Sequence, residues 1–166
     1  MIEIARLSTR YDVRRLTESD VDEVFELCRG NTQFYQYCEA SPTREQVLND
    51  MRITPPGIAP SHKYYVGFYR QRTLVAVMDL IDGYPEPEIA YIGFFMMNSL
   101  HQGKQIGSSI IGEAAQYLKG TGKRAIRLAI NKANPQSTHF WKKNSFTVLR
   151  EIDRGDWTIL EAEMIL

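Results

Sequence analysis

The chain has 166 residues, of which 43% are hydrophobic and 24% are charged, an ordinary composition for a globular protein that can bury a core. Its 20 basic and 20 acidic residues cancel, so the net charge provides no general attraction to nucleic acid or to an anionic membrane. The apolar runs are too short to span a bilayer, and the first residues do not resemble a signal peptide. We therefore expect a single cytoplasmic domain over residues 1–166.

The first third of the chain reads as a strand followed by two helices. Residues 11–16 interleave apolar and charged side chains, as a strand does. Thr17 and Asp20 are spaced as a capping box, and the helix after them is apolar at Val21, Val24, Phe25 and Cys28. A second helix is expected to start at residues 41–43, with Pro42 in its first turn. A loop with three prolines, residues 54–60, follows it.

The rest of the chain reads as strands that surround one long helix. A hairpin is expected over residues 63–69 and 73–81, followed by a buried strand over residues 88–97. A helix is expected over residues 106–118, because apolar residues recur on one face of that stretch. The last predicted elements are a strand at 125–130, a helix at about 135–143 and strands at 146–152 and 157–164. Three consecutive strands before the long helix predict a largely antiparallel sheet, and the helix then makes a right-handed crossover.

The loop between the buried strand and the long helix contains Gly103 and Gly107. Glycines allow a ligand to approach the backbone closely, and the first N–H groups of a helix have no partners within the helix. Such a helix start suits a phosphate or a pyrophosphate. Taken alone, the same pattern also fits an ordinary turn between a strand and a helix.

Two motifs give this loop a more specific interpretation. The segment Gln102-Gly-Lys-Gln-Ile-Gly107 resembles the Gln/Arg-x-x-Gly-x-Gly/Ala loop of the GNAT N-acetyltransferase superfamily, which wraps the pyrophosphate of acetyl-CoA. Downstream, Asn134-Pro-Gln-Ser-Thr-His-Phe-Trp-Lys-Lys-Asn-Ser-Phe146 is similar to the Asn-x-x-Ala-x-x-Phe-Tyr-x-Lys-x-Gly-Phe segment of that superfamily. The order of the two motifs and the strand between them also match.

The resemblance implies the GNAT fold. This is an α/β (α+β) fold with a mixed, mostly antiparallel central sheet of six to seven strands flanked by about four helices. Three residues depart from the motifs: Gln105 replaces the first glycine, Trp141 the usual tyrosine, and Ser145 a second glycine. Gln105 can still donate its N–H to phosphate if its φ is negative. Trp141 lacks the phenol that is proposed in many members to protonate the departing thiolate, and we expect it to pack beside pantetheine.

The resemblance also implies a set of residues that bind acetyl-CoA. Backbone N–H groups of residues 103–108 would hold the pyrophosphate, with Lys104 adding charge. Main-chain groups at residues 95–97 would hold pantetheine as an added strand does, and one N–H there would polarise the thioester carbonyl. Asn134 would contact pantetheine, and Lys143 or Lys142 would meet the outer phosphate. The expected cofactor-binding residues are Phe95, Met96, Met97, Gln102, Gly103, Lys104, Gln105, Ile106, Gly107, Ser108, Asn134, Ser137, Trp141 and Lys143.

The group that deprotonates the acceptor amine is not fixed by the sequence. In histone-type members a strand glutamate does this, and its position corresponds to Tyr91 here. Glu88 lies three residues earlier, on the other face of an ideal strand, and a bulge or a water relay could bring it in. Glu88 and Tyr91 are therefore the catalytic candidates, with Asp79 and Tyr84 as alternatives. The three histidines lack metal-ligand spacing, so we expect no metal.

The acceptor site is expected between residues 31–40, the proline loop 54–60 and the start of the strand at Glu88. Phe34, Tyr35 and Tyr37 would form an apolar wall that favours a neutral amine, although simple packing would also explain them. Glu39 or Glu88 would attract a cationic substrate.

The main hypothesis is an N-acetyltransferase that moves the acetyl group of acetyl-CoA to a primary amine of a small molecule or peptide. Its partners would be acetyl-CoA and the amine, without nucleic acid or membrane, and it would be a monomer or a homodimer. The same fold would permit another acyl-CoA. A degenerate CoA-binding module that acts as a sensor or binds a partner protein is the alternative, motivated by Gln105 and Trp141.

Overall fold

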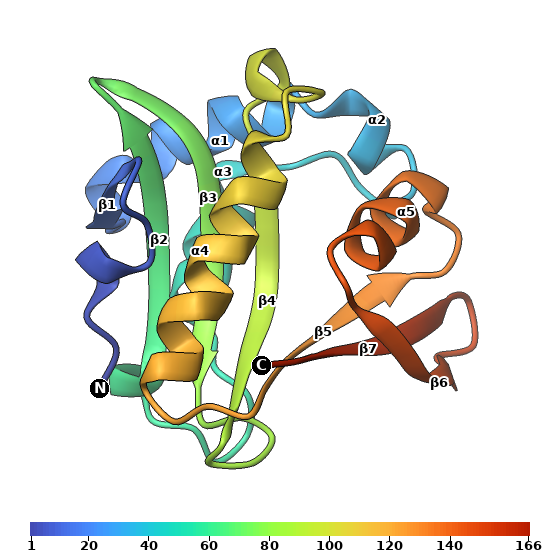
Figure 1. Cartoon of the computed structure of the whole chain (residues 1–166). Coiled ribbons are helices and arrows are strands. Elements are labelled where there is room, and N and C mark those ends of the chain that lie inside the picture. The colour runs from blue at the N-terminus through green and yellow to red at the C-terminus, as the bar shows by residue number, and fades with distance from the viewer.

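The computed structural model describes residues 1–166 as a seven-stranded sheet with helices on both faces (Figure 1). The strands are β1 (Asp12–Arg15), β2 (Lys63–Arg70), β3 (Thr73–Asp82), β4 (Ile89–Met97), β5 (Ala125–Asn131), β6 (Thr147–Asp153) and β7 (Thr158–Ile165). The α-helices are α1 (Val21–Arg29), α2 (Thr32–Tyr35), α3 (Arg44–Arg52), α4 (Ile106–Gly120) and α5 (Pro135–Lys143). None of these helices combines the length and the apolar character that crossing a membrane requires.

The strand order is β1-β2-β3-β4-β5-β7-β6. Every neighbouring pair is antiparallel except β4 and β5, which are parallel and connected through α4. The predicted α/β (α+β) fold with a mostly antiparallel sheet is thus confirmed. The fifth α-helix is the single turn α2, which forms in a segment whose sequence predicts no regular element.

Helix starts follow the capping residues in the sequence. Thr17 and Asp20 form the predicted capping box ahead of α1. The Thr43 side chain accepts from the Gln46 N–H, which makes Thr43 the N-cap of α3. Pro42 therefore lies just before the helix and not in its first turn, contrary to the prediction. The cap, which satisfies an N–H that the helix leaves unpaired, sets this boundary.

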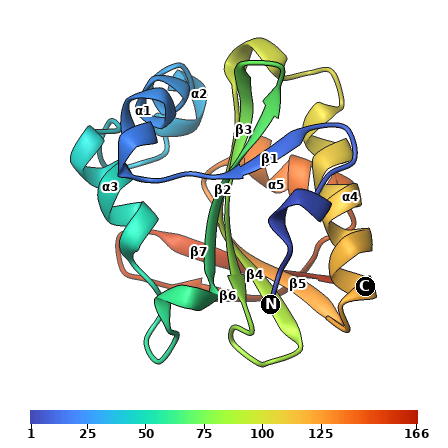
Figure 2. The same cartoon turned by 90° about the vertical axis from the view of Figure 1, so that its left-hand side faces the viewer.

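Figure 2 shows α4 on one side of the sheet and α1 and α3 on the other. A hydrophobic cluster of side chains lies on each side. One lies beneath α4 and includes Ile110, Ile111 and Leu118. The other lies beneath α1 and α3 and draws only on β2, β3 and β4 for its buried sheet residues. No residue of β5, β6 or β7 belongs to this second cluster, so α1 and α3 leave that half of the sheet uncovered.

The two halves of the sheet meet only briefly. β4 and β5 pair from Ile89 opposite Ala125 to Ile92 opposite Leu128, although both strands continue beyond these pairs. Figure 1 shows β5 turning away from β4 after this short contact. Past the last pair, Gly93 forms a bulge, because Asp79 of β3 lies opposite Phe94 while Leu80 lies opposite Ile92. The separation leaves the β5-facing edge of β4 unpaired toward Met97.

Candidate functional site

A cavity of about 480 Å³ opens where β4 ends, beside the N-terminus of α4 and beside α5. It is lined by every predicted cofactor-binding residue except Lys104. Those lining residues are Phe95, Met96, Met97, Gln102, Gly103, Gln105, Ile106, Gly107, Ser108, Asn134, Ser137, Trp141 and Lys143. The exposed Lys104 instead donates from Nζ to the Leu100 carbonyl at 3.1 Å, so the backbone of its own loop holds its charge.

The N-terminus of α4 presents free donors to this cavity. The N–H groups of Ile106, Gly107 and Ser108 have no backbone acceptor, and the first helical bond is that of Ser109 to the Gln105 carbonyl at 3.0 Å. The first turn carries no acidic side chain that would neutralise the positive end of the helix dipole. Three adjacent N–H donors at the start of a 15-residue helix can bind an anion such as a phosphate.

Two departures from the family motifs adopt the backbone conformation of the glycine they replace. Gln105 has φ of 60° and Ser145 has φ of 68°. The negative φ considered for Gln105 is therefore not the one it adopts. The chain makes its turn into α4 in the left-handed region, at a cost of about 1–2 kcal/mol for a residue with a side chain. A glycine would adopt this conformation without that cost.

The opposite wall of the cavity is aromatic. The Phe95 and Phe140 rings stack with centroids 6.0 Å apart, and Trp141 lies 5.0 Å from Phe140 and 5.9 Å from Phe95. Phe140 also abuts the helix start, because a Cβ on Gly107 would lie 3.2 Å from its ring. The side chains at positions 95, 140 and 141 thus give the cavity an apolar surface.

A buried amide that we did not predict fixes the loop to the rest of the fold. Asn31 is 5% exposed, and its Nδ2 donates to the carbonyls of Leu27 and Met97 at 2.8 and 2.9 Å. Its Oδ1 accepts from Gln102 Nε2 at 2.6 Å, so the Gln102 side chain braces the loop. The only sequence signal for Asn31 was a polar residue directly after the glycine that ends α1. Thr32 and Gln33, which belong to the expected acceptor segment 31–40, also line the cavity. Further lining residues that we did not predict are Gly30, Ser99, His101, Gln136, His139 and Phe140.

The predicted acceptor residues do not all gather at one place. Phe34 lines the cavity, and Tyr35 packs edge-on against it with ring centroids 5.2 Å apart. Burial raises the pKa of the Tyr35 phenol, and its hydrogen bond with Cys28 raises that pKa further. Tyr37 is held beside the end of β5, because its backbone carbonyl accepts a hydrogen bond from Asn131 Nδ2 at 3.0 Å.

Glu88 and the proline loop lie far from residues 31–40. The proline loop leads into β2, whose first residue Lys63 pairs with Ile81 of β3. Ile81 also pairs with Tyr91, three residues after Glu88. Both segments therefore belong to the end of the sheet where β4 begins, whereas Asn31 contacts Met97 where β4 ends. Nine residues of extended chain from Glu88 to Met97 span about 30 Å. The expected three-sided acceptor site is therefore not formed, because β4 separates its parts.

Tyr91 lies on the sheet face opposite α4, since its neighbours Ala90 and Ile92 are buried beneath that helix. Its ring packs edge-on against Tyr84 at 5.2 Å. Burial, together with the nearby Tyr84 and Glu161, raises the pKa of Tyr91 to about 12. The phenol therefore keeps its proton at neutral pH and cannot act as a base there.

Comparison with known proteins agrees with this geometry. A sequence model described as the acetyltransferase (GNAT) family matches residues 22–146. An uncharacterised N-acetyltransferase of Methanocaldococcus jannaschii is 24% identical over 160 residues, which cover 93% of this chain and 68% of the relative.

Two solved structures share the fold over nearly their whole length. An acetyltransferase from Thermus thermophilus superposes with a TM-score of 0.75 at 21% identity, covering 93% of this chain and 96% of that one. The PaiA N-acetyltransferase from Thermoplasma acidophilum, in complex with coenzyme A, gives 0.68 at 21% identity, covering 93% and 98%. With three quarters of the sequence matched by the family model, the chain belongs to the acetyltransferase (GNAT) family and is an acetyltransferase.

Proposed function

We propose that the protein transfers the acetyl group of acetyl-CoA to a primary amine of a small molecule or peptide. The observation that carries this proposal is the set of free N–H groups at Ile106, Gly107 and Ser108, which face a cavity beside an unpaired strand edge. An anion site and a strand edge together match the two parts of CoA that a protein must hold. These are the pyrophosphate and the pantetheine arm with its two amides.

Acetyl-CoA would lie in the cavity in one orientation. The pyrophosphate would accept from the α4 N-terminus, and the exposed Lys143 on the cavity rim would meet the outer phosphate. Pantetheine would then lie against residues 95–97 of β4, with its amides paired to the edge that β5 leaves free. Trp141, which is 7% exposed, would pack beside the arm. This direction carries the thioester toward the point where β4 and β5 separate.

The reaction requires a neutral amine, because an ammonium has no lone pair for attack on the thioester carbonyl. An amine like that of lysine has a pKa near 10.4 in water, so the enzyme must help to remove its proton. We place the acceptor on the sheet face opposite α4, where Tyr91 lies and where α2 closes the rim with Phe34. A backbone N–H of β4 near the bulge would polarise the thioester oxygen.

A binding measurement and a turnover measurement test the proposal together. Acetyl-CoA should raise the melting temperature, because a ligand that binds only the folded state stabilises it. Free CoA thiol should then be released in the presence of at least one amine from a panel of spermidine, L-lysine and a short peptide with a free N-terminus. Stabilisation without thiol release from any amine in a broad panel would favour the CoA-binding module instead. The comparisons give no support to that alternative.

A further inference from the structure

The point at which β4 and β5 separate is open on the face opposite α4. Gly93 and Ala129 are the first residues beyond the last pair, and both are exposed. The run from Met97 back to Gly93 covers about 13 Å of extended strand. A pantetheine arm held along that run, as in the proposed function, brings its thioester to this opening. A group that receives the proton of the acceptor must therefore reach the same opening.

Two carboxylates approach it, one from each side. Asp79 of β3 lies beneath the bulge, where a Cβ on Gly93 would come within 2.7 Å of its Oδ2. That oxygen is already held by Lys63 Nζ at 2.6 Å, and both side chains are at least nine-tenths buried. The other oxygen, Oδ1, is closed to solvent and has no partner. No substrate can reach Asp79 without opening the core, which excludes it as the proton acceptor.

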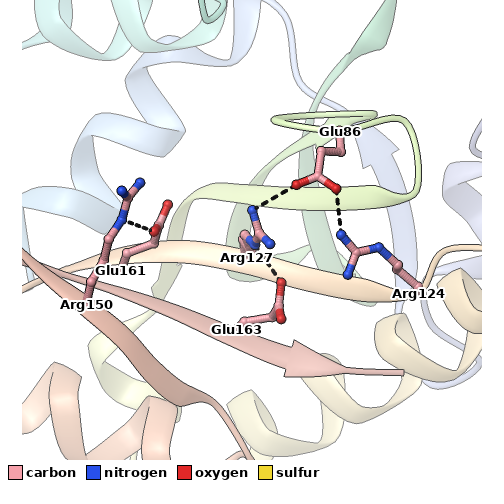
Figure 3. Close-up of polar contacts among 6 residues, drawn as sticks. All are labelled: Glu86, Arg124, Arg127, Arg150, Glu161 and Glu163. Atoms are coloured by element: carbon pink, nitrogen blue, oxygen red, sulfur yellow. Dashed lines mark hydrogen bonds and ion pairs between the residues drawn. The ribbon is translucent and has the colours of Figure 1, made fainter.

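Glu161 of β7 lies on the open side. Its backbone pairs with Ala129, and the neighbouring Ala162 is fully buried, so alternation places the Glu161 side chain on the uncovered face. Figure 3 shows it there, with Arg150 of the edge strand β6 beside it. Arg150 Nε lies 2.6 Å from Oε2, but the Arg150 side chain is 67% exposed. An ion pair with so exposed a partner is weak and leaves the carboxylate free to take up a new contact.

The next carboxylate on the same strand is held differently. Glu163 lies 2.5 Å from Arg127 Nε, and these two side chains are only 10% and 17% exposed. Arg127 also reaches Glu86 at 3.5 Å, and Glu86 in turn lies 2.6 Å from Arg124 (Figure 3). Glu163 thus belongs to a chain of ion pairs that fixes β5 and β7 to the turn before β4. Of the two β7 carboxylates, Glu161 is the one nearer the opening and the one less constrained.

We propose that Glu161 accepts the proton of the acceptor's ammonium group, directly or through one water molecule. This inference rests on the proposed function. The neutral nitrogen then attacks the thioester carbonyl carbon, the C–N bond forms and the C–S bond breaks. The nitrogen loses its second proton, the departing thiolate takes up one proton to give the CoA thiol, and Glu161 releases the other proton to solvent. Tyr91 stays protonated beside this path, where its ring forms part of an apolar wall and its hydroxyl stays neutral.

Several charged or titratable groups face Glu161 and can affect how the activity depends on pH. They are Arg150 on β6, Arg127 on β5, Tyr91 on β4 and Glu163 on its own strand. Burial alone would lower the pKa of Arg127, but its hydrogen bond to Glu163 and the nearby carboxylates raise it, and Tyr91 keeps its proton to about pH 12. Between pH 7 and pH 10 the state of the amine itself is therefore the main variable. As the pH rises above neutrality, a growing fraction of the amine is already neutral in solution and needs no base.

The test compares Glu161→Gln with Glu163→Gln, a substitution on the same strand and the same face. At pH 7 and saturating acetyl-CoA, Glu161→Gln should lower kcat about 100-fold with unchanged affinity for acetyl-CoA. Raising the pH to 10 should restore most of the loss. Glu163→Gln should stay within about threefold of the parent at both pH values. The amine used is the most reactive one of the panel above.

Three results would overturn the inference. These are a Glu161→Gln variant as active as the parent, a loss that persists at pH 10, and an equal loss in Glu163→Gln with normal folding. Each of them leaves the proposed function intact, because the parent enzyme still releases thiol. A parent that releases none from any amine refutes the proposed function first. A melting curve for each variant separates loss of folding from loss of chemistry.

Discussion

Three single residues, Gln105, Gly107 and Ser145, stand out by their backbone conformation or by their lack of space for a side chain. Gln105, in the loop before α4, and Ser145, just after α5, hold left-handed conformations at two positions where the family pattern has glycine and this chain does not. Gly107 is different, because its φ is helical and its lack of a side chain matters for space. It is buried against Phe140 and Met97, and it carries one of the three free N–H groups.

Replacing Gly107 by valine should weaken CoA binding at least tenfold. A Cβ alone would lie 3.2 and 3.3 Å from Phe140 ring atoms, so a branched side chain must displace the ring or cover the N–H donors. The matched control is Gly112→Ala in the same helix, where a Cβ meets nothing within 4 Å. That variant should bind CoA normally and gain up to about 1 kcal/mol of stability from better helix propensity. Calorimetric titration of both variants with CoA checks this, and parent-like affinity in Gly107→Val would contradict it.

At the scale of elements, α4 is fixed from outside as well as from the core. Glu113 on its outer face accepts from Ser8 Oγ at 2.5 Å and from the Thr9 N–H at 2.9 Å, and it lies 3.0 Å from Arg10 Nε. Burial alone would raise the pKa of Glu113, but these hydrogen bonds and the Arg10 charge outweigh it and lower the pKa. The contacts hold the segment before β1 against the helix whose N-terminus forms the proposed anion site.

Glu113→Gln should therefore cost stability in a pH-dependent way. The unfolded-state pKa is about 4.3, and the folded pKa is lower. The stabilisation is then fully present above the unfolded value and is lost as the pH falls through the folded value. The variant should be about 1–2 kcal/mol less stable than the parent at pH 7, and the difference should shrink below pH 4. Urea unfolding of both proteins across this range measures it, and a difference independent of pH would rule out the charge as its cause.

Across the whole molecule, local patterns predicted the elements well. Thr17, Thr43 and Asn134 cap the helices that follow them, and the spacing of apolar residues in α4 matches its buried face. The loop residues 102–108 were predictable for the same reason, since their chemistry depends on neighbours in sequence. Lys104 is the exception, because its ammonium finds an acceptor within its own loop.

The parts that escaped prediction depend on pairing between distant segments. Asn31 joins the cavity only because the end of α1 meets the end of β4. Glu161 gains its position from the register of β7 against β5 and from the early separation of β5 from β4. Glu88 is a candidate because it lies three residues before Tyr91 in the sequence. In the structure it lies at the start of β4, whereas the cavity lies at the end of that strand. No local pattern encodes these relations.

The split of the sheet is central to the proposed site, because it creates both the free edge of β4 and the opening beside Glu161. A crystal structure of the protein with CoA tests it most directly. The proposed binding mode predicts pyrophosphate oxygens within about 3 Å of the N–H groups of Ile106 to Ser108, the usual hydrogen-bond distance. It also predicts pantetheine along Phe95 to Met97 and the sulfur at the separation of β4 and β5. CoA bound elsewhere, or with its sulfur pointing away from that opening, would contradict it.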